Sequence, residues 1–151
     1  MSATELVKGL PIAFVGVALL CAPPAGAEPA DELEQGIAAV RAGGSCAALR
    51  HDPLVEQAAE ISNRSTEDYL NHDAEYVPVA DPLIVLTDLG SDAGIATQLQ
   101  GHGDTVAAAV KGALLQGHSS LADCSYEAFG TSVIRNPDKG YTLVVAVLAG
   151  P

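Results

Sequence analysis

The sequence predicts an α+β fold in which helices cover both faces of a small sheet with a C-terminal hairpin. In the stretch from Cys46 to His72, apolar side chains recur every three to four residues after Pro53, which is typical of an amphipathic helix. From Leu143 to Leu148 every residue is apolar, so both faces of that strand must be covered. A sheet covered on both faces needs helices on each side.

Length and composition favour one domain with one core. The chain has 151 residues, of which 48% are hydrophobic and only 17% charged. The formal net charge of −12 argues against binding to nucleic acid or to anionic lipid surfaces, because both are negatively charged. This balance suits an acidic, soluble extracellular protein.

The first 27 residues have the pattern of a secretory signal. Lys8 precedes an apolar run from Leu10 to Leu20, and Ala25, Gly26 and Ala27 supply a small-residue cleavage site. We therefore expect a signal peptide at residues 1–27, export from the cell, and a mature domain at residues 28–151.

Two alternatives exist at this N-terminus. The apolar run is shorter than the roughly 20 residues that span a bilayer, so a retained membrane anchor is the less favoured outcome. Lipid attachment at Cys21 is the other, but the bulky Leu20 stands where lipoprotein signals need a small residue. After cleavage we expect no integral membrane segment.

Two cysteines remain in the mature chain, Cys46 and Cys124. An even pair in an exported chain predicts a disulfide bond, which would connect the start of the helical half to the start of the strand half. Two free buried thiols are the alternative.

Local signals place the elements in chain order. Asp52 is a good N-cap for a helix that begins at Pro53, since proline has no N–H to leave unpaired. If that helix continued to His72, His72 would lie in phase with Leu54 and point inward. The remaining expectations are a helix over 29–42, a loop over 73–81, a short buried strand over 83–86, an irregular segment over 90–103, a helix after an Asp104 cap, and a hairpin of strands 129–135 and 141–149 around a turn at 136–140.

Several motifs in this order resemble the CAP superfamily (cysteine-rich secretory, antigen 5, pathogenesis-related 1; SCP-like domain). Tyr69-Leu70-Asn71-His72 is similar to the end of the family's second helix, and Gln116-Gly117-His118 to the end of its third. The segment from Tyr126 to Val133 resembles the strand that follows. The N-terminal part of the family pattern is matched by Arg41, Leu49, Asp52, Val55, Ala58 and Ala59.

The resemblance implies a CAP-like α-β-α sandwich in a short secreted bacterial protein, similar to actinobacterial members of the mycobacterial type. It also implies a cleft that holds His72 and His118, with Tyr69 beside it. Family members complete this cleft with two glutamates. Here residues 89–94 contain no Glu, and residues 106–116 contain no acidic residue.

The residues themselves give weak support for catalysis. The four histidines show no strong zinc spacing, and a tight zinc site needs three or four ligands. We therefore expect an exported, non-catalytic domain without a cofactor that binds a small apolar ligand or a protein partner. The alternative is a metal-assisted hydrolase with zinc on His72 and His118.

Overall fold

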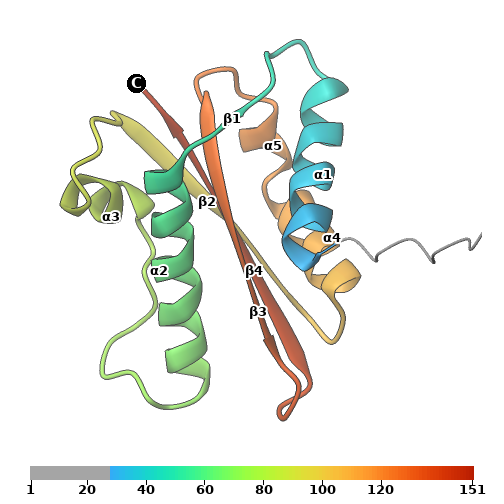
Figure 1. The fold of residues 1–151 in the computed structure, drawn as a ribbon, viewed down its shortest axis with the longest axis vertical. Coiled ribbons are helices and arrows are strands. Elements are labelled where there is room, and N and C mark those ends of the chain that lie inside the picture. Colours follow the sequence, from blue (N-terminus) through green and yellow to red (C-terminus); the bar gives the residue numbers. More distant parts are fainter. Residues whose placement is uncertain (1–27) are drawn as a thin grey trace, which may run out of the picture.

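The computed structural model describes residues 28–151, and the expected signal peptide lies outside this range. Figure 1 shows the helices and strands along the chain. In order they are α1 (Pro29–Ala42), β1 (Arg50–His51), α2 (Pro53–Leu70), α3 (Pro82–Asp88), β2 (Ile95–Gly103), α4 (Val106–Gln116), α5 (His118–Leu121), β3 (Ala128–Asn136) and β4 (Tyr141–Gly150).

The sheet has four strands in the order β1-β3-β4-β2. The short β1 pairs parallel to β3, whereas β3 with β4 and β2 with β4 pair antiparallel. The expected C-terminal hairpin is confirmed, with Asn136 opposite Tyr141 at its turn. Gly140 in that turn has a φ of 72°, a conformation that glycine adopts without strain.

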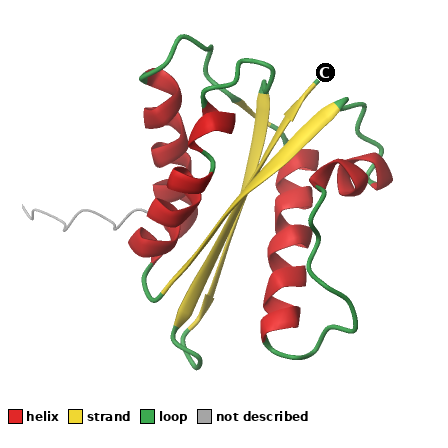
Figure 2. Cartoon of the chain, turned by 180° about the vertical axis from the view of Figure 1, so that it is seen from behind, coloured by secondary structure: helices red, strands yellow, loops and turns green. Residues whose placement is uncertain are grey.

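Helices cover both faces of this sheet, as Figure 2 shows from behind. The α1, α4 and α5 helices pack on one face, and α2 and α3 pack on the other. The α-β-α sandwich is therefore confirmed. It explains why residues 142–150 of β4 are all buried, since alternate side chains enter the two cores.

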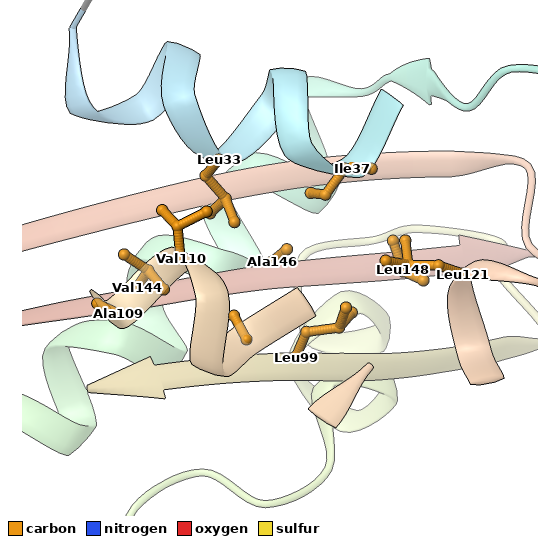
Figure 3. Packing of buried hydrophobic residues seen from close by; sticks show 10 residues of the cluster. Leu33, Ile37, Leu99, Ala109, Val110, Leu121, Val144, Ala146 and Leu148 are labelled. Carbon is orange, nitrogen blue, oxygen red and sulfur yellow. The ribbon is translucent and has the colours of Figure 1, made fainter. Parts of the chain in front are cut away.

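Figure 3 shows the larger of the two cores, which lies between α1, α4, α5 and the sheet. Its side chains are almost fully removed from water, and this burial is the main favourable term in folding. The labelled residues are Leu33, Ile37, Leu99, Ala109, Val110, Leu121, Val144, Ala146 and Leu148.

The start of α2 follows the sequence prediction. Asp52 Oδ1 accepts hydrogen bonds from the backbone N–H of Leu54 at 3.0 Å and of Val55 at 3.4 Å, and Pro53 is the first helical residue. A hydrogen bond from the Arg50 side chain holds the pKa of the Asp52 carboxyl below its ordinary value. The prediction that Leu54 is core was wrong, because 38% of that residue is exposed.

The strand expected over residues 83–86 was wrong, because these residues belong to α3. Asp81 accepts a hydrogen bond from the Leu83 N–H at 2.9 Å, and Pro82 is the first helical residue. Asp81-Pro82 repeats the Asp52-Pro53 signal that begins α2. The apolar run is therefore helical, and its Leu86 enters the core against α2.

The irregular segment expected over residues 90–103 was also wrong beyond Ile95, where the regular strand β2 begins. Its glycines serve close packing against α4. A Cβ on Gly101 would lie 1.8 Å from the carbonyl oxygen of Ala109. The expected Asp104 cap was one residue off, since Thr105 Oγ1 accepts the Ala108 N–H of α4.

The disulfide between Cys46 and Cys124 is confirmed. It joins residues 78 apart in sequence, and a closed loop of that length stabilises the fold by about 4 kcal/mol in the chain-entropy model.

Within residues 28–151, no helix has the length and apolar character needed to cross a membrane.

Glycine substitutions test the contact between β2 and α4. We expect Gly101→Ala to lower the free energy of unfolding by about 1–3 kcal/mol, because the added methyl group displaces the α4 backbone. Gly112→Ala is the matched control. Gly112 lies in α4, and a Cβ added there would be 3.8 Å from its nearest neighbour, the Cα of Gly101. We expect it to raise stability by up to about 1 kcal/mol. Urea unfolding measures both, and an unchanged Gly101→Ala protein would contradict this packing.

Candidate functional site

The candidate site is built around Arg41, near the end of α1. Arg41 is only 4% exposed, and its guanidinium donates four hydrogen bonds to backbone carbonyl oxygens. The acceptors are Ala47 O, Leu121 O and Asp123 O, each at 2.8 Å, and Tyr126 O at 2.6 Å. This one side chain therefore fixes the segment after α1, the end of α5 and the approach to β3.

An apolar cavity of about 330 Å³ opens beside this guanidinium. It lies between α1, the segment that leads into β1, and the start of β3. Most of its lining is hydrocarbon, contributed by Ile37, Ala38, Ala42, Ala48, Leu49 and Phe129.

The polar groups around this cavity are largely engaged. Arg41 lines it, but four of its N–H bonds already point at carbonyls. Glu34 Oε1 accepts a hydrogen bond from Thr131 Oγ1 at 3.2 Å. Cys46 at the rim is held in the disulfide with Cys124. The cavity therefore offers an apolar surface with one carboxylate at its edge.

His72 and His118 come from elements that pack on opposite faces of the sheet. His72 follows α2, whose apolar side packs on one face of the sheet, whereas His118 begins α5 on the other face. The shared cleft stays a prediction, because Leu70 at the end of α2 and Gln116 at the end of α4 line one groove. Both histidines are exposed at their separate positions.

The end of α2 explains the position of His72. The helix stops at Leu70, and His72 has a φ of 62°, which turns the chain away from the helical path. Asn71 instead accepts a hydrogen bond from the Tyr141 hydroxyl at 3.2 Å. Tyr69, expected beside the cleft, is 48% exposed.

The other two histidines, His51 and His102, lie beside side chains that do not form a metal site with them. His51 Nε2 lies 3.3 Å from a Glu56 carboxylate oxygen, with both side chains more than 40% exposed. His102 lies beside the Tyr141 ring, with 5.8 Å between the ring centroids. Over residues 28–151, no three His, Cys, Asp or Glu side chains are grouped so that they could hold a metal ion.

Sequence reasoning used Arg41 as part of a family pattern and did not identify its structural role. A signal was present, because Leu33, Ile37 and Arg41 recur at four-residue spacing along the buried side of α1. A charged residue in an apolar stripe predicts buried hydrogen-bond partners. Three of the four partners lie 80 to 85 residues away along the chain and were not visible in the sequence.

Substituting both His72 and His118 by alanine tests the site that the resemblance implied. Because both side chains are exposed, we expect the free energy of unfolding to change by less than about 0.5 kcal/mol. Calorimetric zinc titrations of the wild type and the double variant are expected to coincide. Tight one-to-one zinc binding that is lost in the double variant would contradict this placement.

The chain matches no protein-family model and no curated protein. Among solved structures it resembles an outer surface protein from Borrelia burgdorferi, with a TM-score of 0.64 and 14% sequence identity. That match covers 81% of this chain and 92% of the other.

Two further similar structures contain the domain that the sequence motifs indicated. A cysteine-rich secretory protein from Staphylococcus aureus has a TM-score of 0.61, and an extracellular protein containing a SCP domain from Bacillus anthracis has 0.57. Both are 14% identical to this chain over 82% of its length, and the matches span 38% and 40% of those longer proteins. These sources do not support the expected similarity to actinobacterial proteins. At this identity the likeness concerns the fold, and the fold is that of the CAP or SCP domain.

Proposed function

We propose that this chain is an exported, non-catalytic CAP-like domain that binds a small apolar ligand in the cavity beside Arg41. The observation that carries the proposal is the cavity itself. Its volume of about 330 Å³ falls at the lower end of the range of small-molecule sites, and its lining is predominantly apolar.

The size of the cavity favours a small molecule over a protein partner at this position. A stable protein interface buries roughly 800 Å² on each partner, far more than a pocket of this kind offers. A short hydrocarbon chain or ring fits the side chains of Ile37, Leu49 and Phe129. The Glu34 carboxylate at the rim favours a ligand that is neutral or carries a hydrogen-bond donor at one end.

A metal-assisted hydrolase was the second candidate. It required His72 and His118 to share one metal ion with at least one further ligand. The two residues come from elements on opposite faces of the sheet, and within residues 28–151 no three His, Cys, Asp or Glu side chains are grouped as metal ligands. No observation in the described residues favours this function.

Export is part of the proposal. The disulfide between Cys46 and Cys124 supports it, because such bonds persist in oxidising compartments outside the cytoplasm. The similar solved proteins are described as an outer surface protein, a secretory protein and an extracellular protein.

A fluorescent apolar probe tests the cavity. We expect the purified protein to bind N-phenyl-1-naphthylamine at one saturable site, with increased fluorescence. The Ala38→Phe variant places a ring in the cavity, and we expect its affinity for the probe to fall by at least about ten-fold, equivalent to 1.4 kcal/mol. Ala38 is exposed on α1, so the fold should tolerate the larger side chain.

The matched control is Ala39→Phe. Ala39 is also an exposed residue of α1, but it does not line the cavity. We expect this variant to bind the probe as the wild type does. Equal weakening by both variants, or undiminished binding by the Ala38→Phe variant, would show that the probe does not occupy this cavity.

A further inference from the structure

The strand β2 forms an edge of the sheet that is unusually suitable for pairing with an additional strand. It occupies the last position in the strand order, and all nine of its residues pair with β4 on one side only. In Figure 1 it runs as a long straight strand from the α3 side of the molecule to the start of α4. Most strands in globular proteins are shorter.

The composition of β2 lacks the usual protection of edge strands. Natural edges carry lysine or other charges, proline or bulges that prevent a further strand from adding. The β2 sequence, IATQLQGHG, contains no Asp, Glu, Lys, Arg or Pro, and its register with β4 is unbroken from Ile95 to Gly103.

One backbone N–H group of β2 that points away from β4 already donates a hydrogen bond. The Gln100 N–H donates a hydrogen bond to Gln116 Oε1 at 2.7 Å. An amide carbonyl from the end of α4 thus occupies the place that the carbonyl of an added strand would take. Because outward groups alternate along an antiparallel strand, the N–H groups of Gln98 and His102 face the same way.

A groove lies at this edge, between α2 and Gln116 at the end of α4. Its volume is about 470 Å³. The α2 helix contributes Thr66 and Leu70, the floor is Leu143 and Val145 of β4, and the β2 wall is Gln100 and His102. An added strand would direct alternate side chains toward this groove, as in peptide recognition by strand addition.

The charge near the groove favours a cationic partner. Glu67 and Asp68 lie in the last turn of α2 and Asp73 follows it, whereas that turn contains no basic residue. Negative charge at the carboxyl end of a helix is unfavourable, because the helix dipole is negative there. A lysine or arginine of a bound partner would relieve this unfavourable charge.

We infer that β2 docks an extended peptide segment of a partner protein, with apolar side chains in the groove and a basic residue near the end of α2. The site is separate from the cavity beside Arg41, which lies across the sheet. A second copy of this chain is a poorer occupant, because two copies each carry a formal net charge of −12.

Fluorescence anisotropy with a designed peptide tests this inference. The probe is a labelled nonapeptide of alternating valine and threonine with a lysine at each end. We expect saturable binding to the purified protein. The same peptide with alternate backbone nitrogens methylated should bind at least about ten-fold more weakly, because it cannot pair along one edge. Glutamate in place of the lysines should also weaken binding.

Two protein variants change the edge in opposite directions. We expect His102→Pro to weaken peptide binding at least about ten-fold, because it removes an outward N–H while the bonds to β4 remain. His102→Ala is its control, since it keeps that N–H. We expect Gln116→Ala to bind the peptide about three-fold more tightly, because the Gln100 N–H no longer has an internal acceptor.

Three results would overturn the inference. The first is equal binding of the methylated and unmethylated peptides, and the second is no binding of either. The third is self-association of the chain in sedimentation experiments that His102→Pro abolishes, which would assign the edge to a second copy. Circular dichroism spectra of the variants confirm that each keeps the fold.

Discussion

The hydrogen bonds of the buried Arg41 guanidinium are the interaction on which one end of this molecule depends. They connect α1 to three backbone segments that are otherwise held together by the Cys46–Cys124 disulfide and by short elements. A charge with 4% exposure is stable only when hydrogen bonds replace its water, and carbonyl oxygens do so here. Two of the acceptors, Leu121 O and Asp123 O, lie at and just after the end of α5, where carbonyls lack helical partners. The same junction forms one wall of the apolar cavity, so the candidate site depends on this side chain.

Sequence reasoning predicted the elements whose signals are local. The Asp52-Pro53 cap, the apolar run of β4 and the paired cysteines each depend on neighbouring residues or on composition, and each was confirmed. It failed where a tertiary contact decides. The glycines of β2 looked irregular because the sequence of the strand alone does not show that the α4 backbone at Ala109 packs against Gly101. Spacing along the chain also does not indicate on which face of the sheet a helix packs, so the motifs around His72 and His118 did not show that α2 and α5 lie on opposite faces.

The two faces of the sheet separate two different kinds of surface. On the α1 side, Ile37, Leu49 and Phe129 line an open apolar cavity that suits a small molecule. On the α2 side, an uncharged edge strand and an open groove suit an extended chain. Both surfaces are compatible with a binding domain, and neither depends on the histidines that the family resemblance indicated.

Urea unfolding of an Arg41→Lys variant with its disulfide intact tests whether the four hydrogen bonds of Arg41 hold this end of the molecule together. Lysine keeps the positive charge but cannot donate to four separate carbonyls from one planar group. Since hydrogen bonds to charged groups contribute about 1.5–3 kcal/mol each, the account predicts a loss of at least about 3 kcal/mol in the free energy of unfolding. A lysine variant within about 0.5 kcal/mol of the wild type would show that charge alone suffices and would contradict the role of the four hydrogen bonds.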